Sequence, residues 1–286
     1  MQGKRQTVLR LQVPFCFRQC AFCSKTILPG WDPQRLHAYV QALIQELKAN
    51  GPDFADCQVQ AVRIGGGNVT ALTGEDLWEL YLAVRDNYDL AENAPVTLLA
   101  SPFQINGSLL AFLNRIPVRR YDYEIFSCLA EDDGWLDRPD PMEKLRLAGV
   151  MTHAAETGAM GAVMVLGHPA QTEKSLHKTL VALTRTAASH LTFWQYPGAA
   201  AELPAEDRQL LENAGFGEYV PGCFALAGQE DRYHRLRQQG SEVLAFGMGA
   251  ETVFDGAVSR NTMDLAAYLA HSDDYRQITV SAAPLS

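Results

Sequence analysis

Three cysteines near the start of the chain have a spacing that suits metal chemistry. Cys16, Cys20 and Cys23 form a CxxxCxxC pattern within eight residues. Thiolates are the usual protein ligands of iron–sulfur clusters, and a cubane cluster contains four irons. Three cysteines in one short loop can hold three of these irons and leave the fourth open to a substrate or a cofactor. We therefore predict a [4Fe–4S] cluster on this loop.

The main alternative for the cysteine loop is a structural zinc site. Zinc normally takes four protein ligands, and the sequence has no second CxxC or HxxxH pair that would supply the fourth. The remaining cysteines are scattered, and we interpret them as small buried hydrophobic residues. They are Cys57, Cys128 and Cys223.

The composition is that of a globular protein without a membrane span. Of the 286 residues, 47% are hydrophobic and 20% are charged, and no apolar run approaches the roughly 20 residues that cross a bilayer. The first apolar stretch is interrupted by Arg10 and Gln12, unlike a signal peptide, so a cytoplasmic location is expected. The net charge of −9 argues against nucleic acid as a partner.

Short β-type runs alternate with amphipathic helical patterns along the chain. Strands are predicted at 7–13, 58–64, 95–100, 120–126, 160–166 and 190–196, with helices beginning near Pro33, Thr73, Leu109, Asp140, Leu176 and Pro204. Six such units predict a parallel sheet with right-handed crossovers. They fall short of the eight that close a barrel, so we expect an α/β fold with a partial (β/α)6 barrel at 1–216 and a C-terminal extension packed on it at 217–286. A doubly wound open sheet is the alternative.

The cysteine loop and a run of glycines follow the first two predicted strands. The carboxyl ends of parallel strands meet at one edge of a sheet, which is where the active sites of α/β proteins form. Gly65–Gly67 lack side chains, so their backbone can approach a ligand closely and expose N–H groups to it. An ordinary tight turn is the alternative interpretation of the glycines. Beside the cysteine loop, we favour ligand binding.

With an aromatic residue, Phe22, directly before the third cysteine, the loop resembles the signature of the radical SAM superfamily. The resemblance implies that the open iron binds S-adenosylmethionine. An electron from the cluster would cleave this cofactor to a 5′-deoxyadenosyl radical, which takes hydrogen from a small organic substrate. The resemblance also implies an electron donor of the flavodoxin or ferredoxin type.

Further motifs resemble one branch of that superfamily, the oxygen-independent coproporphyrinogen III oxidase-like proteins and the related heme chaperone. These motifs are VPFC at 13–16, GGGNVT at 65–70, GHPAQT at 167–172, GMGA at 247–250, DG at 255–256 and RNT at 260–262. The C-terminal domain that is usual in the branch is expected to be absent. The cofactor-binding residues that the resemblance implies are Phe22, Gly65, Gly66, Gly67, Asn68 and Arg138.

Several positions depart from the pattern of this branch. On the first strand, Arg10 and Gln12 stand where the branch has tyrosine and histidine. Polar cofactor contacts expected on the third, fourth and fifth strands are replaced by apolar residues, which are Leu99, Phe126 and Val163. Asp122 and Glu124 share one strand face with Arg120. They are candidates for a replacement carboxylate or for a salt-bridged polar face.

The residues that distinguish the two named activities are also altered. The oxidases have a further cysteine where this chain has Lys25, and the heme chaperone's HNxxYW is reduced to His234. His234 is either a candidate axial ligand or a solvated side chain, and His168 is either a proton-transfer residue or a hydrogen-bonded turn residue. We expect a radical SAM enzyme acting on an organic substrate, with tetrapyrroles as one class. The alternative is a non-catalytic iron–sulfur or heme-binding protein on the same scaffold.

Overall fold

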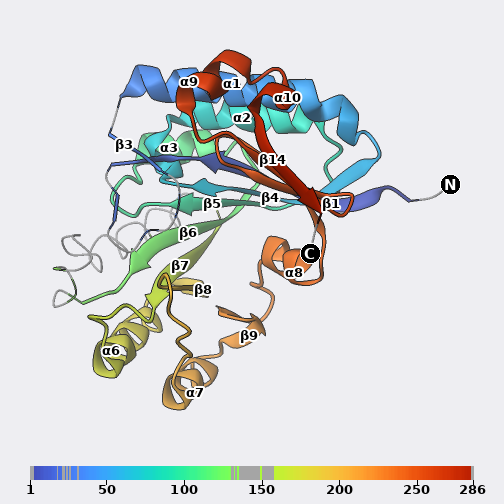
Figure 1. Ribbon diagram of the computed structural model, residues 1–286. Coiled ribbons are helices and arrows are strands. Elements are labelled where there is room, and N and C mark those ends of the chain that lie inside the picture. Colours follow the sequence, from blue (N-terminus) through green and yellow to red (C-terminus); the bar gives the residue numbers. More distant parts are fainter. Residues whose placement is uncertain are drawn as a thin grey trace.

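A curved sheet with helices on its convex side forms the body of the protein in the computed structural model (Figure 1). The structure describes residues 3–17, 19–20, 23, 25, 27–30, 32–129, 132, 134, 149 and 158–284. The helix predicted to begin at Asp140 lies outside these residues, as do Phe22 and Arg138. None of the described helices is long and apolar enough to cross a membrane.

Within the described residues, the main sheet has twelve strands in the order β14-β13-β12-β11-β1-β4-β5-β6-β7-β8-β10-β9. Six neighbouring parallel strands confirm the predicted partial barrel: β1 (Arg5–Val13), β4 (Cys57–Gly66), β5 (Val96–Ala100), β6 (Val118–Phe126), β7 (Ala159–Leu166) and β8 (Ala188–Gln195). A seventh parallel strand, β11 (Glu242–Phe246), pairs with β1 from the other side. This strand lies within the segment predicted as a C-terminal extension.

The helices on the convex side begin where the sequence provides capping residues. Asp32 accepts hydrogen bonds from two backbone N–H groups at the start of α1 (Pro33–Asn50), and Thr73 forms a capping box with Asp76 at α2 (Gly74–Asn87). The remaining outer helices are α3 (Gly107–Leu113), α6 (Glu173–Leu183), α7 (Ala205–Asn213), α9 (Leu265–His271) and α10 (Tyr275–Ile278). Their apolar faces bury one continuous core against the sheet.

The C-terminal part of the chain extends the sheet at both edges. Two antiparallel strands, β10 (Cys223–Ala225) and β9 (Gly217–Val220), continue from β8. Beyond β11 lie β12 (Glu251–Phe254), β13 (Ala257–Asn261) and β14 (Thr279–Pro284). The division of the chain at residue 217 stays a prediction.

One described helix, α8 (Arg232–Gln238), lies on the concave side of the sheet. Its Tyr233 packs against Val8 of β1, Ala61 of β4 and Val243 of β11. The other described helices of three or more turns contribute to the core on the opposite face. This one-sided layering is that of a partial barrel and excludes the doubly wound alternative.

A buried carboxylate joins the C-terminal part of the chain to α1. Glu46 accepts hydrogen bonds from the backbone N–H of Gly247 at 2.8 Å, Nδ2 of Asn261 at 2.6 Å and the hydroxyl of Tyr268 at 2.5 Å. Burial raises the pKa of Glu46 to about 7, against the opposing effect of these donors. Two of the motifs noted in the sequence, at 247–250 and 260–262, therefore have a structural role in holding this segment in place.

Candidate functional site

The three cysteines occupy a loop at the carboxyl end of β1. A short parallel pair closes the base of the loop, formed by β2 (Phe15–Cys16) and β3 (Leu28–Pro29). Within the loop, the N–H of Cys23 donates to the carbonyl of Cys20 at 3.0 Å. All three cysteines are partly buried and none is in a disulfide. The structure thus places them at the predicted edge of the sheet.

The surroundings of the loop favour the neutral thiol form of Cys16 and Cys23. Burial raises the pKa of Cys16 to about 12, and the negative charge of Glu124 adds to this effect while Lys25 opposes it. Burial also raises the pKa of Cys23. Thiolates are the metal-binding form, so metal binding here has to release protons.

The glycine turn packs directly against the cysteine loop. The N–H of Gly67 donates to the carbonyl of Val13 at 2.6 Å, and the N–H of Asn68 donates to the carbonyl of Phe15 at 2.7 Å. A Cβ on Gly67 would lie 2.8 Å from the carbonyl carbon of Phe15 and 3.0 Å from Sγ of Cys16. Only glycine therefore permits this approach, and the geometry fits a loop held in a fixed shape around a bound group.

The Asn68 side chain serves the turn itself. Its Oδ1 accepts from the N–H of Thr70 at 3.1 Å, which caps the short 3₁₀ helix Val69–Ala71. Its Nδ2 donates to Gln104. The backbone N–H of Asn68 acts to lower the pKa of Cys16, against the larger effect of burial. In this structure, the contribution of Asn68 to the cysteine loop comes from its backbone.

The apolar replacements noted in the sequence form a single cluster beneath the loop. Leu99, Phe126 and Val163 come from three adjacent strands and bury one another, and Cys20 and Trp194 pack against them. Phe126 has a φ of 67°, in the left-handed region, where the pairing of β6 with β7 shifts register. The three positions at which polar cofactor contacts were expected therefore form a hydrophobic wall.

An ion pair fixes the cysteine loop to the barrel wall. Nζ of Lys25 lies 3.0 Å from Oε1 of Glu124 on β6 and 3.8 Å from the centre of the Trp194 ring on β8. The side chain of Glu124 is 8% exposed. Asp122 and Glu124 were both candidates for a replacement carboxylate. The structure brings Glu124 near the cysteine loop.

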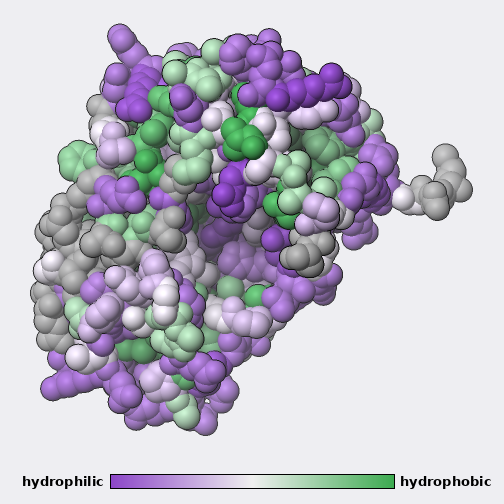
Figure 2. Space-filling view, in the orientation of Figure 1, coloured by the Kyte–Doolittle hydropathy of each residue, from purple (hydrophilic) through white to green (hydrophobic). Residues whose placement is uncertain are grey.

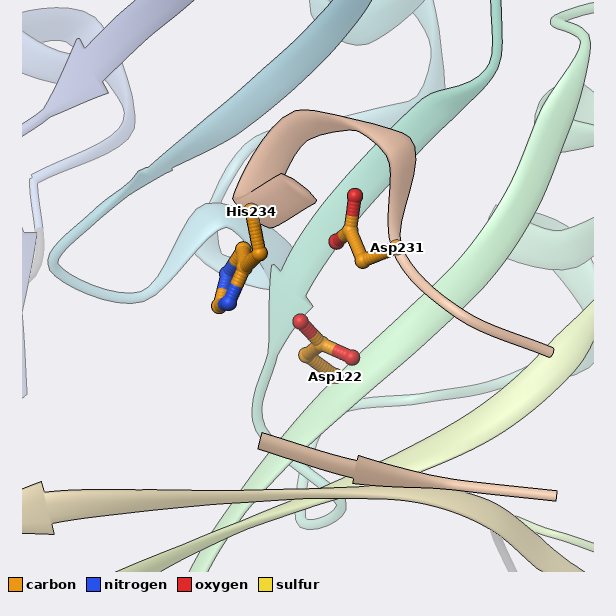
Figure 3. Close-up of side chains that lie close together, drawn as sticks. All are labelled: Asp122, Asp231 and His234. Carbon is orange, nitrogen blue, oxygen red and sulfur yellow. The ribbon is translucent and has the colours of Figure 1, made fainter. Parts of the chain in front are cut away.

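A second group of charged residues lies deeper in the barrel. Figure 3 shows Asp122 from β6, Asp231 before α8 and His234 on α8 converging. Nη1 of Arg63 lies 2.9 Å from Asp122 and 3.2 Å from Asp231. Burial acts to lower the pKa of Arg63, but the two carboxylates outweigh it and raise that pKa. Because the Arg63 guanidinium supplies the positive charge beside both carboxylates, we interpret this group as an internal ion network.

Both candidate histidines contact other residues of the protein. Nδ1 of His234 lies 3.0 Å from Sγ of Cys223, and burial lowers its pKa, so His234 is neither solvated nor directed outward. Nδ1 of His168 accepts from the N–H of Ala170 at 3.0 Å, and its ring contacts Tyr196. His168 is thus a hydrogen-bonded turn residue, the second of the two interpretations.

The internal ion network was not predicted from the sequence. Arg63 stands at an inward position of β4, between Ala61 and Gly65, so strand alternation predicts a charge inside the barrel. Asp231 and Cys223 come from the C-terminal part of the chain, and no local pattern links them to this strand. The three scattered cysteines are buried, as predicted.

Comparisons with known proteins agree with this architecture. No protein-family model matches the sequence. The chain is 23% identical to the oxygen-independent coproporphyrinogen III oxidase of Salmonella typhimurium, with 95% of this chain and 66% of that protein covered. It is 23% identical to the heme chaperone HemW of Escherichia coli, with 89% and 72% covered. The chain thus spans about two thirds of the length of these relatives.

Solved structures show the same fold. The coproporphyrinogen III oxidase HemN of Escherichia coli, a radical SAM enzyme, superposes with a TM-score of 0.82 at 20% identity, over 99% of this chain and 73% of that one. The enzyme anSMEcpe, solved with bound AdoMet and a peptide, has a TM-score of 0.51 at 14% identity, over 73% and 58%. The chain is therefore similar to coproporphyrinogen III oxidases and heme chaperones and has the fold of the radical SAM enzyme HemN.

Proposed function

We propose that this protein is a radical SAM enzyme with a [4Fe–4S] cluster held by Cys16, Cys20 and Cys23. The observation that carries the proposal is the close packing of the cysteine loop on the glycine turn. A Cβ on Gly67 would collide with the backbone that carries Cys16, so the two segments are built to lie against each other. The relatives, one of which is named a radical SAM enzyme, support the same assignment.

Cys16, Cys20 and Cys23 would hold the cluster, which when bound would supply the electron for reductive cleavage of S-adenosylmethionine. The chain's own residues give this chemistry its setting. Backbone N–H groups of the glycine turn orient the loop, and the Lys25–Glu124 pair fixes it over the barrel. The apolar wall of Leu99, Phe126 and Val163 excludes water from the space beneath Cys20. Exclusion of water protects a reactive radical from side reactions.

The substrate is an organic molecule that enters the hollow of the barrel. Figure 2 shows the concave side of the molecule as a hollow with hydrophilic residues in its depth. An electron donor of the flavodoxin or ferredoxin type would reduce the cluster. Phe22 and Arg138 are further proposed cofactor contacts, together with Gly65, Gly66, Gly67 and Asn68.

The test is anaerobic reconstitution with iron and sulfide, followed by reduction in the presence of S-adenosylmethionine. We expect 5′-deoxyadenosine to form and the EPR signal of the reduced cluster to change when the cofactor is added. Cys20→Ala should abolish both. The matched control is Cys57→Ala, which removes a buried thiol from β4, outside the cysteine loop, and should leave both intact.

Three other results would contradict the proposal that this protein is a radical SAM enzyme. A cluster whose EPR signal is indifferent to S-adenosylmethionine would indicate an iron–sulfur protein without radical chemistry. Heme binding without 5′-deoxyadenosine would indicate a heme-binding protein. Tightly bound zinc without iron would indicate a structural metal site and would exclude both cluster-based functions.

A further inference from the structure

A cavity of about 300 Å³ opens beside the cysteine loop, on the side of β1 and β11. Arg10 and Gln12 of β1 line one wall, and Lys25 contributes the side of the loop. The opposite wall comes from the segment after β11 and from β13: Gly249, Ala250, Glu251, Arg260 and Met263. A Cβ on Gly66 would meet the Gln12 amide at 2.7 Å, so this cavity adjoins the glycine turn as well. It therefore adjoins both segments of the proposed cofactor site, the cysteine loop and the glycine turn.

The charges that line this cavity are balanced except for one. Lys25 is paired with Glu124 at 3.0 Å, and Nε of Arg260 donates to Glu251 at 3.0 Å. Arg10 donates only to the neutral Oε1 of Gln12, at 3.0 Å, and no carboxylate among the described residues lies within ion-pair distance of it. The cavity thus presents one guanidinium, that of Arg10, without an ion-pair partner in the part of the chain that the structure describes.

The placement of Arg10 without a carboxylate partner is energetically unfavourable. Burial lowers the pKa of Arg10, and Arg63 adds to this effect, while Tyr233 and Glu251 oppose it without reversing it. Arg5, at the start of the same strand, has a raised pKa because Asp255 and Glu242 bind it. An arginine keeps its proton under all ordinary conditions. A partly buried charge without a counter-ion costs stability unless a ligand supplies the opposite charge. A bound anion would supply the counter-charge that the described residues do not place within ion-pair distance of Arg10.

We infer that Arg10 binds a carboxylate group of the substrate in this cavity. The planar guanidinium matches a planar carboxylate through two parallel hydrogen bonds. The inference rests on the proposed function, which identifies the bound molecule as the substrate. It adds that this substrate is an organic acid and that Arg10 is a specificity-determining residue. The carboxylate of S-adenosylmethionine has the same chemistry, and the experiment separates the two sources.

The probe is succinate, with succinamide as its uncharged analogue at matched ionic strength. Binding to the cluster-reconstituted protein is measured by calorimetry and by the shift in melting temperature. We expect succinate to bind and succinamide not to bind. Arg10→Gln should weaken succinate at least about tenfold, the usual effect of losing a charged hydrogen bond. Arg10→Lys, which keeps the charge but loses the planar fork, should fall between.

The matched control is Arg85→Gln, which removes the same charge from an exposed position on α2 and should leave succinate binding unchanged. Equal binding of succinate and succinamide would overturn the inference, as would a wild-type protein that binds neither. The affinity for S-adenosylmethionine is measured on the same variants. A tenfold loss there in Arg10→Gln, with succinate competing against the cofactor, would assign Arg10 to the cofactor and overturn its assignment to the substrate.

Failure of the proposed function is distinguishable from failure of this inference. Succinate binding is read without turnover, whereas the proposed function is read from 5′-deoxyadenosine and the EPR signal. A protein that binds succinate through Arg10 and forms no 5′-deoxyadenosine would retain the anion site and lose the proposed chemistry.

Discussion

Substitution of Gly67 by alanine tests the fit between the glycine turn and the cysteine loop. The added Cβ would lie 2.8 Å from the carbonyl carbon of Phe15 and 3.0 Å from Sγ of Cys16. Backbone atoms cannot rotate away as a flexible side chain can, so the loop must shift. Overpacking of this kind costs about 1–3 kcal/mol. The shift also strains the hydrogen bond from Asn68 to Phe15, which contributes about 1 kcal/mol.

The matched control for this substitution lies two residues earlier in the same turn. A Cβ on Gly65 would meet only the Leu99 side chain, at 3.5 Å, which is an ordinary contact. We expect Gly67→Ala to lower both the free energy of unfolding and the iron bound per chain after reconstitution, while Gly65→Ala changes neither greatly. Urea unfolding and iron analysis measure the two effects. Equal iron content in the two variants would refute the reasoning.

Two further predictions concern the buried ionisable groups. Because burial raises the pKa of Glu46 from about 4.5 to about 7, the folded state binds its proton more tightly than the unfolded state. The resulting stability is present below about pH 4.5 and lost as the pH rises through about 7, a change of about 3 kcal/mol. Urea unfolding across this range should show a flatter profile for Glu46→Gln, and an identical profile would contradict the assignment. Lys25→Met should lower the free energy of unfolding by about 1–3 kcal/mol, because it removes the cation that lies 3.0 Å from the buried Glu124 carboxylate. Adding Glu124→Gln should recover most of this loss in a double-mutant cycle, whereas simple additivity would count against the ion pair.

Local patterns were sufficient to predict most of the framework. The alternation of Leu9, Leu11 and Val13 with polar residues predicts which face of β1 meets the helices, and those three residues do lie in the outer core. The caps at Asp32 and Thr73 predict where α1 and α2 begin. Strand β11 was not predicted, because its pairing with β1 is set by contacts between residues far apart in the sequence.

The amino-acid sequence by itself determined the cysteine loop, its position after the first strand and the order of the strand–helix units. These features depend on residue type and on spacing over a few residues. Only the tertiary structure decided which charges are balanced. Lys25 forms an ion pair with Glu124, and Arg63 forms one with Asp231, although these partners are far apart in the sequence. Arg10 pairs with neither of these carboxylates. Charge pairing depends on distance in space, which the curvature of the sheet fixes and no local pattern encodes.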